Sequence, residues 1–123
     1  MISGAVSDLL EPMTSLSLRD EHGQLQQIEA IIDTGFTGSL TLPASVIDSL
    51  RLPWVCRQQG MLADGKVHPF DVYQGTVVWD GAERIVEIEA ADVDPLIGMA
   101  LLSGHQLAIQ VRAGGSVSIQ RLK

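Results

Sequence analysis

Cysteine and aromatic residues are both scarce in this chain. Its 123 residues include a single cysteine, Cys56, so no disulfide can form within the chain, and we expect a reducing compartment, the cytoplasm. Cys56 lies in Trp54-Val55-Cys56-Arg57, without a glycine-rich or helix-start context, and we interpret it as a structural thiol. Aromatic residues make up 4% of the chain and hydrophobic residues 46%, so the core must be aliphatic.

Positive charge and long apolar runs are also lacking. Eight Lys and Arg residues against fifteen Asp and Glu residues give a formal net charge of -7, which argues against nucleic acid or an anionic membrane as a partner. No apolar run approaches the ~18 residues that a membrane span needs, and we expect a soluble protein. His22, His68 and His105 show no metal-ligand spacing, so we expect no metal and no cofactor.

Alternation of apolar and polar residues predicts an all-β chain. Strands are expected at residues 14–19, 27–32, 39–42, 54–62, 67–79, 85–90, 107–111 and 117–119. Only two short helices are expected, one opened by Pro43 and one from Gly98 to Ser103. Tight turns at Asp64-Gly65 and Asp80-Gly81 separate neighbouring strands. This spacing, in one domain of 123 residues, predicts a small closed β-barrel.

The apolar run Ala30-Ile31-Ile32 leads into Asp33-Thr34-Gly35, which places a carboxylate at the end of a strand. Peptide hydrolysis without a metal or a covalent nucleophile needs a general base for water and a general acid for the leaving nitrogen. Two carboxylates that share one proton supply both, because like charges a few ångström apart do not both ionise readily. The chain has one such aspartate, so this chemistry needs a second chain.

A wider pattern follows the triplet. Ser39-Leu40-Thr41-Leu42-Pro43 comes next, then the turn Ala63-Asp64-Gly65-Lys66, then Leu96-Ile97-Gly98 with Leu101-Leu102. In this order the motifs resemble those of the retropepsin-like (retroviral-type) aspartic proteases, over residues 13–119. The resemblance implies a closed acid-protease barrel with one or two short helices. It also implies an aspartic endopeptidase that works as a homodimer on a peptide or protein substrate, with the terminal strands contributing to the symmetric contact.

The resemblance assigns a role to each residue of the triplet. Asp33 matches the catalytic aspartate. Thr34 matches the residue whose hydroxyl bonds across the two-fold axis to the other subunit. Gly35 matches the residue whose backbone meets the substrate near the scissile bond.

The resemblance also implies a substrate-binding set. Residues 62–67 match the flap, a hairpin that closes over bound peptide, and residues 96–98 match a buried segment that supports the catalytic loop. Leu40 and Val67 are further candidates for pocket walls. The substrate-binding candidates are Phe36, Leu62, Ala63, Asp64, Gly65 and Ile97.

Three positions depart from the viral pattern. Viral members usually have a small residue at the position of Phe36 and an Asp–Arg pair at the positions of Thr37 and Met99. Both partners of the pair are absent together, so no buried charge is left alone, although a dimer-stabilising contact is missing. We therefore expect a bacterial or cellular branch of the family. The alternative is a non-catalytic peptide-binding or dimerisation module with the same fold, and an activity assay on an Asp33→Asn variant separates the two.

Overall fold

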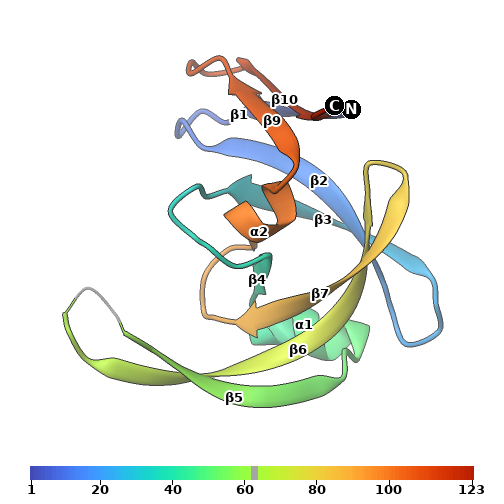
Figure 1. Cartoon of the computed structure of the whole chain (residues 1–123), viewed down its shortest axis with the longest axis vertical. Coiled ribbons are helices and arrows are strands. Elements are labelled where there is room, and N and C mark those ends of the chain that lie inside the picture. Colours follow the sequence, from blue (N-terminus) through green and yellow to red (C-terminus); the bar gives the residue numbers. More distant parts are fainter. Residues whose placement is uncertain (62–63) are drawn as a thin grey trace.

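The chain folds mainly as β-structure, which confirms the all-β prediction. A computed structural model describes residues 1–61 and 64–123, and this part contains ten strands and two short helices (Figure 1). The elements are β1 (Ile2–Val6), β2 (Pro12–Arg19), β3 (Leu25–Ile32), β4 (Leu40–Leu42), α1 (Ala44–Leu50), β5 (Trp54–Met61), β6 (Val67–Trp79), β7 (Ala82–Ala90), β8 (Leu96–Ile97), α2 (Met99–Leu102), β9 (His105–Ile109) and β10 (Ser116–Arg121).

The ten strands form one sheet in the order β5-β6-β7-β4-β8-β3-β2-β1-β10-β9. The predicted turn between β6 and β7 is present, and Asp80 and Gly81 have φ values of 51° and 80°, as a tight hairpin turn with two positive φ angles requires. In addition β2 pairs with β6 through Ser17 and Leu18. Two strands that are distant in the strand order are therefore joined directly.

The core is aliphatic, as the composition predicts. In β2, buried Thr14, Leu16 and Leu18 alternate with partly exposed residues, which confirms the predicted face. Among the buried core residues that are described, Trp79 alone is aromatic. The long β6 contributes Val77 and Trp79 to the same interior. The burial of these side chains supplies most of the driving force for folding.

The helices are short. α1 begins one residue after Pro43, which acts as its N-cap with an extended ψ of 151°. It ends before Arg51, whose left-handed φ of 53° stops the helix. α2 covers four residues, fewer than the six expected from Gly98 to Ser103. Among the described residues, neither helix has the length and apolar character to cross a membrane.

β1 and the end of β9 differ from the predicted strands. β1 was not among the expected strands, and it pairs with both β2 and β10. Gly4 allows the first pairing, since a Cβ there would lie 2.0 Å from the carbonyl oxygen of Met13. The strand expected to reach Val111 stops at Ile109, because the chain turns where the N–H of Gly115 donates to the carbonyl of Arg112.

The terminal strands pair within the chain. β1 lies between β2 and β10, and β10 lies between β1 and β9. The edge strands of the described sheet are β5 and β9. Part of each terminal strand has one paired edge, since Ile2 and Ser3 pair with β10 and not with β2, while Gln120 and Arg121 pair with β9 and not with β1.

Candidate active site

Asp33 follows the last residue of β3 and begins the loop 33–39 that leads to β4. The short strand β8 lies between β3 and β4, parallel to the first and antiparallel to the second. The backbone N–H of Asp33 donates to the carbonyl of Ile97 over 2.9 Å, and Ile31 donates to Pro95 over the same distance. These two bonds hold the end of β3, and the backbone of Asp33 that follows it, against β8.

The start of α2 holds the rest of the loop. The N–H groups of Met99 and Ala100 donate to the carbonyls of Phe36 and Gly38 over 2.8 and 3.1 Å. Donors at the start of a helix have no partner within the helix, so the loop satisfies them. Gly98 permits this contact, because a Cβ there would lie 2.1 Å from the carbonyl oxygen of Gly38.

The carboxylate of Asp33 is oriented by its own turn. Oδ1 accepts a hydrogen bond from the N–H of Gly35 over 2.9 Å, while the carbonyl of Asp33 accepts one from Phe36 over 3.2 Å. Among the described residues no partner is recorded for Oδ2. Thr34 and Gly35 are exposed and Asp33 is half-buried. The triplet thus presents one free carboxylate oxygen and one hydroxyl at the surface.

Phe36, Ile97 and Leu40 lie differently from the pocket walls that the resemblance implies. The ring of Phe36 is half-buried and packs on its own loop, with Cζ 2.6 Å from the position of a Cβ on Gly38. Ile97 and Leu40 have no exposed surface, because β8 and β4 are interior strands whose side chains enter the core. In this chain the side chains of Ile97 and Leu40 are enclosed in the core and offer no surface to a ligand.

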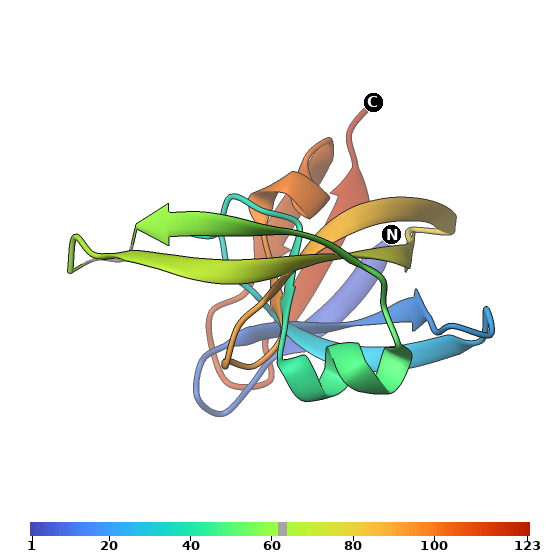
Figure 2. The same cartoon turned by 90° about the horizontal axis from the view of Figure 1, so that it is seen from below.

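The hairpin β5–β6 has the predicted tight turn. Gly65 has a φ of 80° and the N–H of Lys66 donates to Oδ1 of Asp64 over 2.8 Å, while Leu62 and Ala63 lie outside the described residues. Asp64, Gly65 and Val67 are exposed. The hairpin extends on the same side of the molecule as loop 33–39, as two perpendicular views show (Figures 1 and 2).

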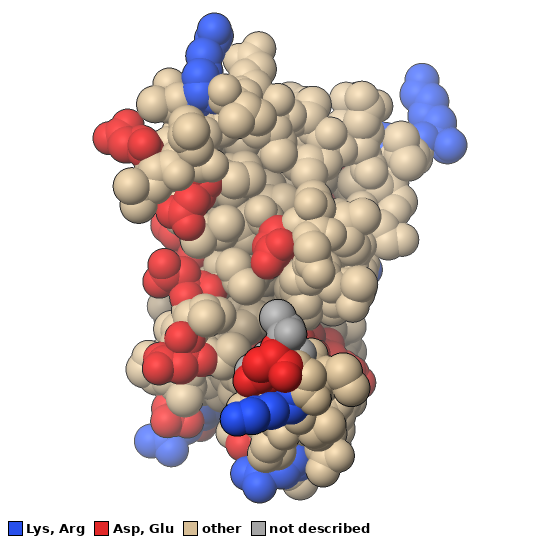
Figure 3. Space-filling model, turned by 90° about the vertical axis from the view of Figure 1, so that its left-hand side faces the viewer, with Lys and Arg blue, Asp and Glu red and all other residues tan. Residues whose placement is uncertain are grey.

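Two loops with exposed apolar side chains lie on that side as well (Figure 1), and they also contain the charged residues Asp8, Glu11 and Arg112. The loop from β1 to β2 exposes Leu9 and Leu10 by 81% and 56%, and the loop from β9 to β10 exposes Val111 by 73%. The two loops are held together where Val6 donates to Gly115 over 2.9 Å. Figure 3 looks onto this side, where acidic side chains gather along the left-hand edge, basic and acidic side chains lie together at the foot, and most of the upper part is neither acidic nor basic.

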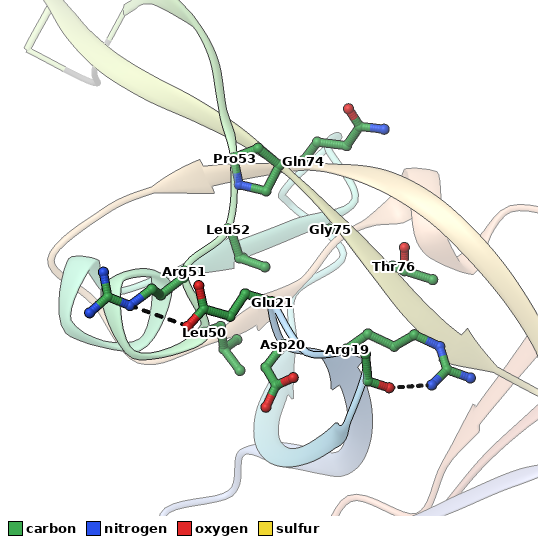
Figure 4. Close-up of a pocket in the computed structure, with 11 residues that line it drawn as sticks. Arg19, Asp20, Glu21, Leu50, Arg51, Leu52, Pro53, Gln74, Gly75 and Thr76 are labelled. Atoms are coloured by element: carbon green, nitrogen blue, oxygen red, sulfur yellow. Dashed lines mark hydrogen bonds and ion pairs between the residues drawn. The ribbon is translucent and has the colours of Figure 1, made fainter.

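A cavity of about 400 Å³ lies away from loop 33–39, between the β2–β3 turn, the end of α1 and β6 (Figure 4). Its charged side chains already have partners. Arg51 lies 3.5 Å from Glu21, and Arg19 donates to the carbonyl of Gly23 over 2.6 Å. None of its lining residues comes from loop 33–39 or from the hairpin tip, so we do not place the site there.

A second cavity, of about 330 Å³, lies under the hairpin. It is lined by Thr41, Gly60, Met61, His68, Pro69, Phe70, Glu89, Ala90 and Ala91. Burial, and secondarily the negative charge of Glu87, raise the pKa of Glu89. Within β7, Glu89 lies on the opposite face from buried Val86 and Ile88. The alternation of β7 shows which residues share that face, but it does not show that residues of the hairpin line the cavity beside Glu89.

The histidines and the cysteine lie apart from one another. His22 lies 3.3 Å from Glu21 in the β2–β3 turn, and Nδ1 of His105 lies 3.1 Å from the carbonyl of Ser103. His68 is on β6 and Cys56 on β5. Within residues 1–61 and 64–123, no three His, Cys, Asp or Glu side chains gather as metal ligands would.

Comparison with known proteins names no family. No protein-family model matches the chain, and no curated protein matches its sequence. The residues and the geometry of loop 33–39 are therefore the features that point to an activity.

A Gly98→Ala variant tests the contact between the loop and α2. Because the new methyl group would overlap the carbonyl of Gly38, we expect the free energy of unfolding to fall by about 1–3 kcal/mol. Gly60→Ala is the matched control, since its methyl group would lie 3.1 Å from Cε1 of the Phe70 ring, a side chain that can move, and not from a backbone atom. Denaturant unfolding measures both, and equal midpoints for Gly98→Ala and the wild type would contradict the close approach.

A Glu89→Gln variant tests the burial of that carboxylate. The folded state holds the proton of Glu89 more tightly than the unfolded chain, so the wild type loses stability as the pH rises from the unfolded pKa through the raised folded pKa. Glutamine does not titrate. We expect the variant to match the wild type at acidic pH and to unfold at a higher temperature at neutral pH. Asp48→Asn, at an exposed position of α1, removes the same charge and controls for the change in net charge. An equal rise in unfolding temperature at neutral pH for Asp48→Asn would contradict the prediction.

Proposed function

We propose that this chain is a retropepsin-like aspartic endopeptidase of a bacterial or cellular branch, active as a homodimer with one Asp33 from each subunit. The observation that carries the proposal is the carboxylate of Asp33. It lies at the end of β3, is oriented by the N–H of Gly35, and belongs to a loop bonded along its backbone to residues 95–100. The order of motifs along the chain supports the same conclusion.

We also propose that the sheet is a closed barrel of the acid-protease type. The pairing of β2 with β6 supports this proposal, because it completes a cycle of pairings through β6, β7, β4, β8, β3 and β2. Closure would leave the strands of the cycle without free edges. The loop 33–39 would then lie at one rim of the barrel.

In the proposed reaction the two Asp33 carboxyl groups share one proton. The ionised group accepts a proton from water as the water oxygen attacks the carbonyl carbon of the substrate. The C–N bond then breaks, and the leaving nitrogen receives a proton from the dyad. In each subunit Oδ1 is occupied by the N–H of Gly35, so Oδ2 is the oxygen left for water and for the partner.

The proposed contact surface is formed by loop 33–39, the loop from β1 to β2 and the loop from β9 to β10. The exposure of Leu9, Leu10 and Val111 supports this choice, because clustered exposed apolar side chains mark contact surfaces. A second copy related by a two-fold axis would cover the same residues on both subunits. The hairpin β5–β6 would close over the peptide, with Gly65 at its tip supplying the positive φ.

An Asp33→Asn variant tests the proposed activity. Asparagine keeps the shape but cannot act as a base, so we expect cleavage of denatured casein to fall at least about 100-fold. Asp48→Asn removes an exposed carboxylate on α1 and should keep full activity. Folded wild-type protein that never cleaves casein would instead support the non-catalytic peptide-binding or dimerisation module.

Mixing the two proteins extends this test to the shared dyad. An excess of Asp33→Asn chains should lower the activity of a fixed amount of wild type, because mixed dimers hold one aspartate. Activity that stays proportional to wild-type chains alone would contradict a site made from two subunits.

A Thr34→Ala variant tests the proposed bond across the axis. If the exposed hydroxyl bonds to the partner, its loss should weaken the dimer by about 1–3 kcal/mol, and Thr34→Ser should be milder. Thr37→Ala, an exposed threonine in the same loop, is the control. Sedimentation equilibrium measures the dissociation constants. Equal constants for Thr34→Ala and Thr37→Ala would remove the cross-axis role.

A further inference from the structure

Glu89 lies where a substrate of the proposed protease would pass. It is the next-to-last residue of β7 and pairs with Thr41 of β4, the strand that follows loop 33–39. Its Oε2 is 3.5 Å from the position that a Cβ on Gly38 would occupy. The carboxylate therefore borders the same loop that carries Asp33.

The charge of Glu89 is not compensated within the described part of the chain. Among those residues no hydrogen bond or ion pair to its carboxylate is recorded, although the group is half-buried. Arg84 lines a neighbouring cavity with Glu89, but one of its nitrogens donates to the carbonyl of Leu101 over 3.1 Å. Glu87, two residues earlier on the same face of β7, is also acidic and raises the pKa of Glu89 further. A half-buried carboxylate without a cation is costly, and a bound cation would offset that cost.

The other walls of the cavity suit the stem of a long basic side chain. Met61, Pro69 and Phe70 from the hairpin provide an apolar lining, with His68 beside them. Lys and Arg commonly lay their methylene stems on apolar surface while the charged end reaches a polar group, and a guanidinium or ammonium group can also lie over an aromatic ring. The cavity volume of about 330 Å³ is near the lower end of ligand pockets, which suits one side chain of a larger ligand.

We propose that this cavity selects a basic side chain, arginine or lysine, in the peptide substrate, with Glu89 as its counter-ion. The inference rests on the proposed function and names the substrate class for that site. Gly38 and Asp33 belong to one loop, so the counter-ion of the selected side chain borders the loop that carries the proposed catalytic aspartate. The formal charge of -7 attracts basic peptides in general, whereas Glu89 acts at one position of the peptide.

The test compares two fluorescent octapeptide mixtures that are identical except that one has arginine at a fixed position where the other has citrulline, its neutral isostere. Binding is measured by anisotropy on Asp33→Asn protein, which should not turn over the peptide. We expect about tenfold tighter binding of the arginine mixture, the size of a partly exposed charge-assisted hydrogen bond. In the Asp33→Asn/Glu89→Gln protein the two mixtures should bind within about twofold of each other.

Glu87→Gln in the Asp33→Asn background is the matched control, because it removes one acidic charge from the same face of β7 outside this cavity. It should keep the arginine preference. A preference that survives Glu89→Gln, one that Glu87→Gln abolishes equally, or no binding of either mixture would overturn the proposal.

Cleavage of the same mixtures by the wild type separates this inference from the proposed function. Cleavage with equal kcat/KM for both mixtures would overturn the role of Glu89 and leave the protease in place. Selective binding that depends on Glu89, without any cleavage, would support the pocket and overturn the protease.

Discussion

The close backbone contact between loop 33–39 and residues 95–100 is the constraint on which the rest of the structure depends. It inserts β8 between β3 and β4 and gives the first N–H groups of α2 their acceptors. Because these bonds join backbone to backbone, they need no particular side chain except the absence of one at Gly98. The position of Asp33 is therefore determined by hydrogen bonding of the main chain and not by contacts of its own side chain.

Strand pairings connect the loop that carries Asp33 to the strand that carries Glu89. Loop 33–39 continues into β4, β4 pairs with β7, and β7 pairs with β6 of the hairpin. The catalytic candidate, the half-buried acid and the hairpin over it are thus linked through successive rows of backbone hydrogen bonds. Rigid strands hold such a constellation more accurately than independent loops would, and accurate placement is what a binding pocket beside a reacting bond requires.

The arrangement of the terminal strands bears on how two chains would meet. β1 and β10 pair with each other within one chain through Ile2–Ala5 and Ser116–Ile119. The exposed apolar residues Leu9, Leu10 and Val111 lie in the loops between β1 and β2 and between β9 and β10, on the same side of the molecule as loop 33–39 (Figure 1). A contact through such loops would be weaker than a shared sheet, and it would make the assembly of the proposed dyad sensitive to protein concentration.

The sequence by itself determined the strands with strong alternation, the aliphatic core, the tight turns at Gly65 and Gly81, and the carboxylate of Asp33 at a strand end. These features are local, since side chains alternate with a period of two and positive φ angles favour glycine. Only the tertiary structure decided that the weak segment of β1 is a strand, that Ile97 is interior, and that the hairpin covers Glu89. Alternation tells which residues share a face of a strand, but which element covers that face depends on pairings between residues far apart in the chain.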